Sequence, residues 1–134
     1  MGASMEKKDI TSLEEIRLLV DTFYGRVRLD GLIGPIFNRL LDGRWEEHLK
    51  KMYAFWETLL LDEHTYFGSP FPPHAAMSLT LTHFETWLGL WRRTVYEFFE
   101  GEKADEAVLR GEKMAAMFLS KIEYFNNLQS KPLT

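Results

Sequence analysis

The chain has 134 residues, of which 46% are hydrophobic and 14% aromatic, with a net charge of −4 and no cysteine. This length suits one domain with a single core. The lack of cysteine excludes disulfides, thiolate zinc sites and iron–sulfur clusters, and the acidic balance without a basic stripe argues against nucleic acid as a partner. No apolar run approaches the ~20 residues of a membrane span, and no leader pattern opens the chain. We therefore expect a cytoplasmic protein without membrane contact.

The first half of the chain shows helical periodicity. Apolar residues recur at helical spacing after capping signals at Thr11 and Ser12, which predicts a helix over about 11–28. Gly34-Pro35 then predicts a turn into a short apolar corner. After a break at Asp42-Gly43, a second apolar pattern predicts a long helix over about 44–61.

Prolines mark the middle of the chain. Residues 62–73 hold one glycine and three prolines without periodicity, and we predict a loop there. Pro72-Pro73 cannot continue a preceding helix but suits the first turn of a new one, which places His74 at the start of a short helix. Thr80 or Thr82 begins the next helix, with Glu85 as the capping-box partner of Thr82.

The remaining pattern is helical as well. The helix before Glu100-Gly101 is expected to end at that glycine, and a last helix is predicted over about 104–128. Its predicted apolar face consists of Val108, Met114, Met117, Phe118, Ile122 and Phe125. We therefore predict an all-α fold with one domain over 11–128. Residues 1–10 are expected to form a disordered N-terminus that includes an expression scar, and 129–134 a C-terminal tail.

The four histidines exclude several metal chemistries. None has a glutamate three residues before it, as the Glu-x-x-His pairs of di-iron bundles require, and no His-Glu-x-x-His or Gly-x-Ser-x-Gly motif occurs. What remains is an aromatic, helical pocket with histidines that none of these motifs uses. Haem iron needs one neutral imidazole as a ligand on one side, and such a histidine can supply it. From chemistry alone, His74 and His83 are equal candidates for that ligand.

Motifs along nearly the whole chain carry a family resemblance. They are Thr22-Phe23-Tyr24-Gly25-Arg26-Val27-Arg28, Gly34-Pro35-Ile36-Phe37-Asn38, Trp45-Glu46-Glu47-His48, Phe55-Trp56, Tyr66-Phe67-Gly68-Ser69-Pro70, Pro73-His74, and His83-Phe84 with Trp87-Leu88. Together and in this order they resemble a group III truncated haemoglobin. The resemblance implies a two-over-two helical globin fold around haem b, formed by residues 11–128.

The resemblance also implies roles for single residues. His74 would be the proximal iron ligand, Tyr24 and Trp87 the distal hydrogen-bond donors, and His48 a distal gate residue, while Phe37 and Met52 would pack on the haem. Plainer alternatives stand beside these roles. Tyr24 could be a core tyrosine, His48 an exposed residue at the edge of its helix face, and His83 a partly exposed residue in the first turn of a helix.

Three functions stay open at this level. The first is capture of dioxygen, carbon monoxide, nitric oxide or cyanide at a five-coordinate haem iron with a polar distal pocket. The second is a redox enzyme, either a nitric-oxide dioxygenase or a peroxidase-like protein, that uses the same haem and a cellular reductase. The third is a helical interaction module without a cofactor, which is disfavoured because the aromatic residues line predicted helix faces. The sequence does not decide between the first two.

Overall fold

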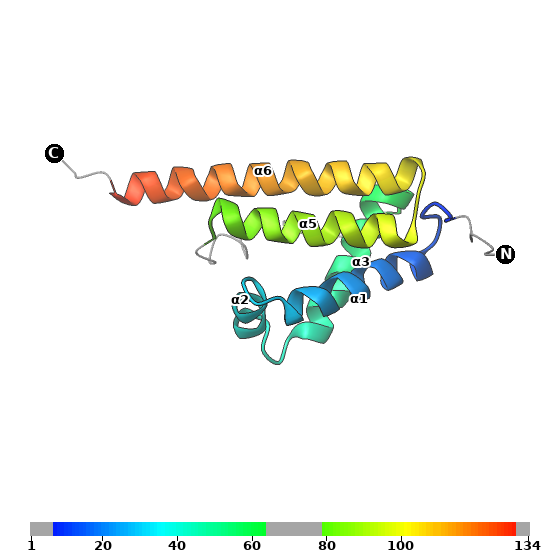
Figure 1. Cartoon of the computed structure of the whole chain (residues 1–134), viewed down its shortest axis with the longest axis horizontal. Helices are drawn as coiled ribbons and strands as arrows, with labels where there is room; N and C mark the ends of the chain where they lie inside the picture. The colour runs from blue at the N-terminus through cyan, green and yellow to red at the C-terminus, as the bar shows by residue number, and fades with distance from the viewer. Residues whose placement is uncertain (1–6, 64–78, 131–134) are drawn as a thin grey trace.

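The computed structural model of the chain describes residues 7–63 and 79–130, with side chains described as far as residue 124. The described helices are α1 (Leu13–Leu29), α2 (Gly34–Leu40), α3 (Trp45–Leu61), α5 (Leu81–Phe98) and α6 (Glu102–Ser130) (Figure 1). The predicted all-α class is confirmed. None of these helices is long and apolar enough to cross a membrane.

The helices form two layers. In Figure 1, α5 and α6 run antiparallel along the length of the molecule, α1 lies beneath α5, and α3 passes behind α1 and α5, with α2 at one end. α1 packs against both α3 and α5, and α3 also packs against α6. This arrangement is the two-over-two pattern that the sequence led us to expect.

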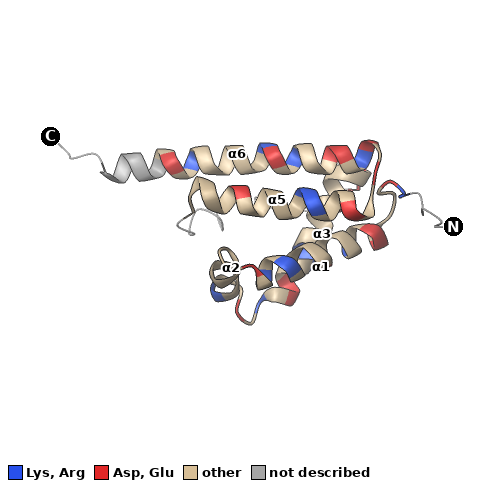
Figure 2. Ribbon diagram, viewed as in Figure 1, with Lys and Arg blue, Asp and Glu red and all other residues tan. Residues whose placement is uncertain are grey.

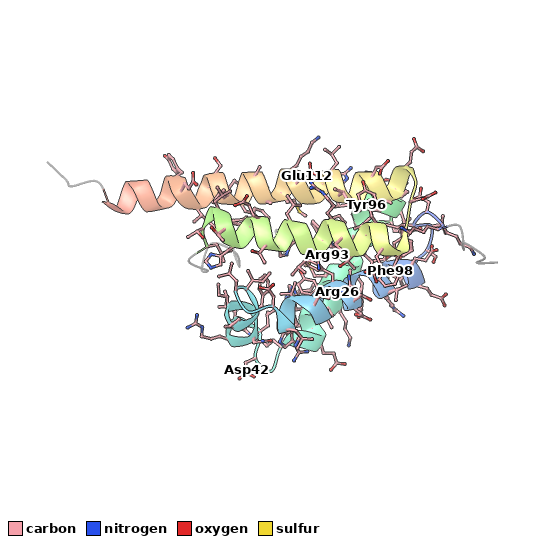
Figure 3. The ribbon with its side chains drawn as sticks, in the orientation of Figure 1. Arg26, Asp42, Arg93, Tyr96, Phe98 and Glu112 are labelled. Atoms are coloured by element: carbon pink, nitrogen blue, oxygen red, sulfur yellow. The ribbon has the colours of Figure 1, made fainter. Side chains whose placement is uncertain are left out.

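A polar contact joins the two layers at α1 and α5. Arg26 of α1 donates from Nη1 to the hydroxyl of Thr94 at 3.1 Å and from Nη2 to both carboxylate oxygens of Glu97 at 2.8 and 2.9 Å. Figure 3 labels Arg26 where α1 meets α5. Thr94 is fully buried, and its hydroxyl also donates to the carbonyl of Leu90 at 2.7 Å, so this buried polar group is satisfied.

The corner after α1 differs from the expected turn, because residues 34–40 form the helix α2. Pro35 lies in its first turn, where the missing N–H costs no intrahelical hydrogen bond. Gly34 lets α2 begin directly against the end of α1, since a Cβ there would lie 2.8 Å from the carbonyl oxygen of Arg28. The glycine and the proline that suggested a turn therefore begin a helix.

The start of α5 corrects the predicted capping box. Thr80 is the N-cap, and the residue three positions on is His83, so Glu85 takes no part. The backbone N–H of Thr80 donates to Nδ1 of His83 at 2.9 Å, and the hydroxyl of Thr80 lies 3.0 Å from the same nitrogen. An imidazole thus replaces the usual glutamate at this position.

The exposed side of α6 includes one residue that was predicted to be buried. Met117 is 44% exposed, whereas Val108, Phe118 and Ile122 are buried. Met117 follows Val108 by nine residues, or about two and a half turns, and therefore lies on the opposite side of the helix. Figure 2 shows acidic and basic residues interspersed along α5 and α6.

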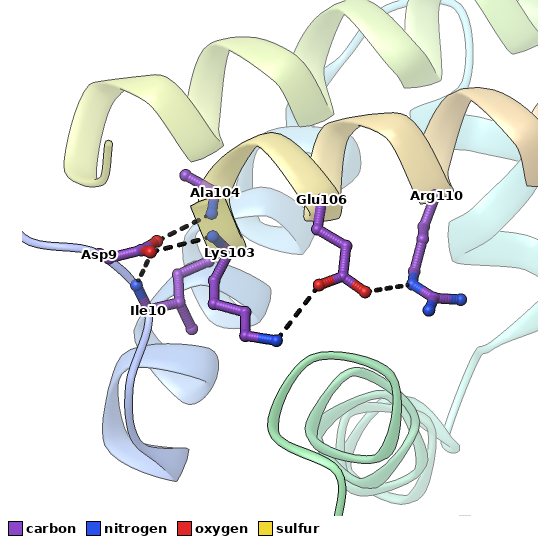
Figure 4. A network of polar contacts seen from close by, with 6 residues as sticks. All are labelled: Asp9, Ile10, Lys103, Ala104, Glu106 and Arg110. Carbon is purple, nitrogen blue, oxygen red and sulfur yellow. Dashed lines mark hydrogen bonds and ion pairs between the residues drawn. The ribbon is translucent and has the colours of Figure 1, made fainter. Parts of the chain in front are cut away.

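The segment before α1 contacts the rest of the fold from Lys8 onward, since the Lys8 carbonyl accepts the backbone N–H of Glu100 at 3.1 Å. We had predicted disorder as far as residue 10. Ile10 is fully buried, and the Asp9 carboxylate accepts the backbone N–H groups of Lys103 and Ala104, each at 2.9 Å (Figure 4). Burial raises the pKa of Asp9, but these hydrogen bonds outweigh it and hold the pKa below its usual value. Gly101 leaves room for the carboxylate, since a Cβ at this positive-φ residue would lie 2.7 Å from Asp9 Cγ.

Candidate functional site

A cavity opens between the two layers, and every described helix contributes to its wall. Most of its described lining residues are apolar or aromatic, and the exceptions that carry a polar atom are Tyr24, His83 and Trp87. The full described lining is Tyr24, Ile33, Phe37, Met52, Phe55, Leu79, His83, Phe84, Trp87, Met114, Ala115 and Phe118. A concave, mostly apolar site with a few polar groups is the usual form of a small-molecule or cofactor site.

Tyr24 brings a hydroxyl to this cavity. The residue lies on the buried face of α1 and is only 5% exposed. Burial raises the pKa of its phenol, and no hydrogen bond or neighbouring charge contributes to the shift. Within the described part of the chain, the hydroxyl has no hydrogen-bond partner. It therefore stays protonated at neutral pH and remains able to donate.

Trp87 brings the second donor, from α5. Its indole N–H has no hydrogen-bond partner among residues 7–63 and 79–124. The Phe23 ring stands edge-on to both donors, with centroid distances of 4.8 Å to Tyr24 and 5.4 Å to Trp87. The two donors thus reach the cavity from different helices and share one buried neighbour.

His48 stands beside Tyr24 rather than in the cavity wall. Its ring meets the Tyr24 ring edge-on at 4.9 Å and the Trp45 ring at 6.0 Å. The side chain is half-buried, and its Nε2 atom is buried. Arg28 lies over the Trp45 ring at 4.6 Å, a cation–π contact on the outer side of this group.

His83 lines the cavity, and its proton position follows from the helix cap. Nδ1 accepts the backbone N–H of Thr80, so a neutral His83 carries its hydrogen on Nε2. The ring is half-buried at the first turn of α5. His83 therefore offers a fixed donor at the cavity wall, in contrast to a freely rotating surface histidine.

Comparisons with known proteins identify this arrangement. No model of a known protein family matches the chain. A relative described as group 3 truncated haemoglobin ctb, from Campylobacter jejuni, is 32% identical over 116 residues, which are 84% of this chain and 91% of that protein. The chain belongs to the group III truncated haemoglobins. The crystal structure of the group III truncated haemoglobin from Campylobacter jejuni is also similar, with a TM-score of 0.77 and 30% identity over 87% of this chain and 95% of that one.

The truncated haemoglobin fold brings together most of the residues singled out in the sequence. Tyr24, Phe37, Met52 and Trp87 all line the cavity. His48 contacts Tyr24 but is not among the described lining residues. The predicted proximal ligand, His74, lies outside the described residues, as do the motif at 66–70 and the predicted short helix.

His83 is a polar cavity residue of this truncated haemoglobin that the family resemblance did not place in the site. Chemistry alone made it an equal candidate with His74 for the iron ligand, and the resemblance made it a partly exposed residue in the first turn of a helix. The available signal was the spacing of Thr80 and His83, which equals that of a capping box. Among the described residues, no group of three or more histidine, cysteine, aspartate or glutamate side chains is placed to hold a metal ion.

Proposed function

We propose that this truncated haemoglobin binds haem b in the cavity and uses it to bind dioxygen or another small diatomic ligand. One observation carries the proposal: an apolar cavity contains two hydrogen-bond donors, Tyr24 and Trp87, without partners in the described part of the chain. A few polar groups in an otherwise apolar cavity are the usual means by which a small-molecule site orients its ligand. A bound ligand with acceptor atoms would accept a hydrogen bond from both side chains.

The described walls of the cavity fit a flat, largely apolar ring. Phe37, Met52, Phe84 and Phe118 come from four different helices and present aromatic or thioether surface to one space. The iron ligand is proposed to be His74, on the strength of the family motif. Haem held in this way would supply an iron atom that can bind a diatomic molecule.

The distal side chains would then hold the ligand. Tyr24 stays neutral because burial raises its pKa, and the Trp87 indole can only donate. Both therefore favour a ligand that carries partial negative charge when bound. We propose that His48, packed against Tyr24, controls entry to this position rather than the strength of binding.

Haem binding can be tested with paired histidine variants. The purified chain should show a Soret band after it is mixed with haem, and His74→Ala should abolish the five-coordinate ferrous spectrum. His83→Ala is the matched control, because its ring caps α5 and lines the cavity but is not the proposed ligand. If His83→Ala loses the haem while His74→Ala keeps it, the ligand assignment is reversed. A wild-type chain without a Soret band refutes the proposed function.

A further inference from the structure

We propose that Gly111 is a positioning residue for the distal pocket, because the space it leaves on α6 determines where Trp91, and through it Trp87, can lie. The inference rests on the proposed function in one respect only, namely that Trp87 donates to the bound ligand. Gly111 does not appear in the described cavity wall and acts through the two tryptophans.

The contact between Trp91 and α6 is too close for any side chain at position 111. The Trp91 indole N–H donates to the carbonyl of Ala107 at 3.0 Å, one turn before Gly111. In an α-helix the same carbonyl also accepts the N–H of Gly111, so the indole must cross the helix surface at that residue. A Cβ on Gly111 would lie 2.7 Å from Cδ1 and 2.9 Å from Nε1 of Trp91.

Trp91 has little room to move away from such a Cβ. It is 1% exposed and stacks on Trp56 with a centroid distance of 4.5 Å and an interplanar angle of 25°. The Phe23 ring meets it edge-on at 5.0 Å. Because protein interiors are close-packed, a displacement of this large, rigid ring must pass to its neighbours.

Trp87 is the neighbour that carries the displacement to the pocket. Its ring is nearly parallel to that of Trp91, with a centroid distance of 6.2 Å and an angle of 16°. The same Cβ on Gly111 would lie 3.7 Å from Cζ3 of Trp87, which is an ordinary contact. A methyl group at 111 would therefore push Trp91 and at the same time touch Trp87, the residue that lines the cavity.

Two other helical glycines show that this constraint is specific. A Cβ built at Gly89, on α5 between Trp87 and Trp91, meets no atom within 4 Å, and the same holds at Gly25, next to Tyr24 on α1. Glycine inside a helix is less favourable than alanine, so those two positions should accept alanine readily. Gly111 carries the same intrinsic penalty, and the close approach of Trp91 explains why glycine is needed there.

The test compares Gly111→Ala with Gly89→Ala in the full chain. Near-ultraviolet circular dichroism, measured before and after haem is added, reports the packing of the indoles. Dioxygen dissociation and the C–O stretching frequency of the carbon monoxide complex report the donors around the ligand. Gly111→Ala should change the indole signal, shift the stretching frequency, and speed dioxygen release roughly fivefold or more, because a hydrogen bond to a charged partner is weakened. Gly89→Ala should leave all three unchanged.

The double variant Gly111→Ala/Trp91→Phe separates positioning from simple loss of stability. Phenylalanine keeps a Cδ1 atom but lacks Nε1 and the hydrogen bond to the Ala107 carbonyl that holds the indole against α6. Its smaller ring can therefore turn away from the new Cβ and should restore the wild-type stretching frequency and much of the dissociation rate. If Gly111→Ala does not fold, this double variant is expected to fold, and its failure to do so would overturn the proposal.

Other outcomes are equally decisive. A Gly111→Ala variant that only loses stability, with normal indole spectra and dioxygen release, would make Gly111 a packing residue and nothing more. If the wild-type chain binds no haem, the proposed function fails separately, and the indole spectra of the three variants still decide whether Gly111 positions the tryptophans.

Discussion

Replacing Tyr24 by phenylalanine should weaken ligand retention without weakening the fold. In the proposed function the phenol donates to a ligand with partial negative charge, and a hydrogen bond of this kind contributes ~1.5–3 kcal/mol. Each 1.36 kcal/mol corresponds to a factor of ten in rate, so dioxygen dissociation should become roughly ten- to a hundredfold faster. Ring packing against Phe23 should persist, because phenylalanine keeps the edge-on contact at 4.8 Å.

The effect on stability should have the opposite sign. A buried hydroxyl without a partner costs about 1–3 kcal/mol, and the Tyr24 hydroxyl has none in the described part of the chain. Because the cofactor-free cavity can admit water to the hydroxyl, we expect the lower end of this range. The free energy of unfolding of Tyr24→Phe should therefore stay constant or rise by up to ~1 kcal/mol in denaturant titrations.

Tyr53 provides a matched control on α3, which lies in the same layer as α1. Its hydroxyl donates to the carboxylate of Asp21, and it does not appear among the described cavity residues. Tyr53→Phe should lose about 0.5–1.5 kcal/mol of stability and leave dioxygen release unchanged, the reverse of the Tyr24 pattern. Stopped-flow displacement of dioxygen by carbon monoxide measures the rate for both variants. A wild-type rate in Tyr24→Phe, or a loss of stability like that of Tyr53→Phe, would refute the assignment of the hydroxyl to the ligand.

Two further predictions concern residues at the edge of the site and at the far end of the molecule. Ligand association, measured by flash photolysis of the carbon monoxide complex, should rise as the pH falls from about 8 to about 5.5. His48→Leu should flatten this pH profile and change the dissociation rate less than Tyr24→Phe does. A variant that keeps the full slope would exclude His48 as the gate. Asp9→Ala should remove about 1–2 kcal/mol of stability at neutral pH, because α6 loses the cap of its first turn. The pKa of Asp9 is lowered in the folded chain, so its contribution to the free energy of unfolding is present above the unfolded pKa near 3.9 and is lost as the pH falls through the folded pKa. A difference in stability between wild type and variant that persists unchanged in acid would contradict the cap.

Helices with strong apolar periodicity were predictable from the sequence, because burial of one face depends on spacing alone. α3 was expected over 44–61 and is found at Trp45–Leu61. α2 was missed because glycine and proline also occur at turns, and only the contact with the end of α1 shows why both are needed at the start of a helix. Met117 was predicted on the buried face because it is apolar, but nine residues after Val108 bring it to the opposite side of α6.

The site was less accessible to sequence reasoning than the fold. Tyr24 and Trp87 lie 63 positions apart, and periodicity alone does not show that they reach one cavity; the family resemblance supplied that expectation. The role of His83 in the cap depends on which threonine begins α5, and two threonines at 80 and 82 suited the pattern. The closeness of Trp91 to Gly111 is a contact between two helices and leaves no local signal in either.

The cap that Asp9 gives to α6 also bears on how long the native state lasts. The two hydrogen bonds join residues 94 and 95 positions apart, so the loop they close includes most of the chain. Closing such a loop is entropically costly, and contacts of this separation tend to form after local ones such as the α5–α6 pair. A contact that forms after the transition state slows unfolding but hardly affects the folding rate. The N-terminal segment would then join the fold last and detach first, and its contacts with α6 would set the lifetime of the folded protein.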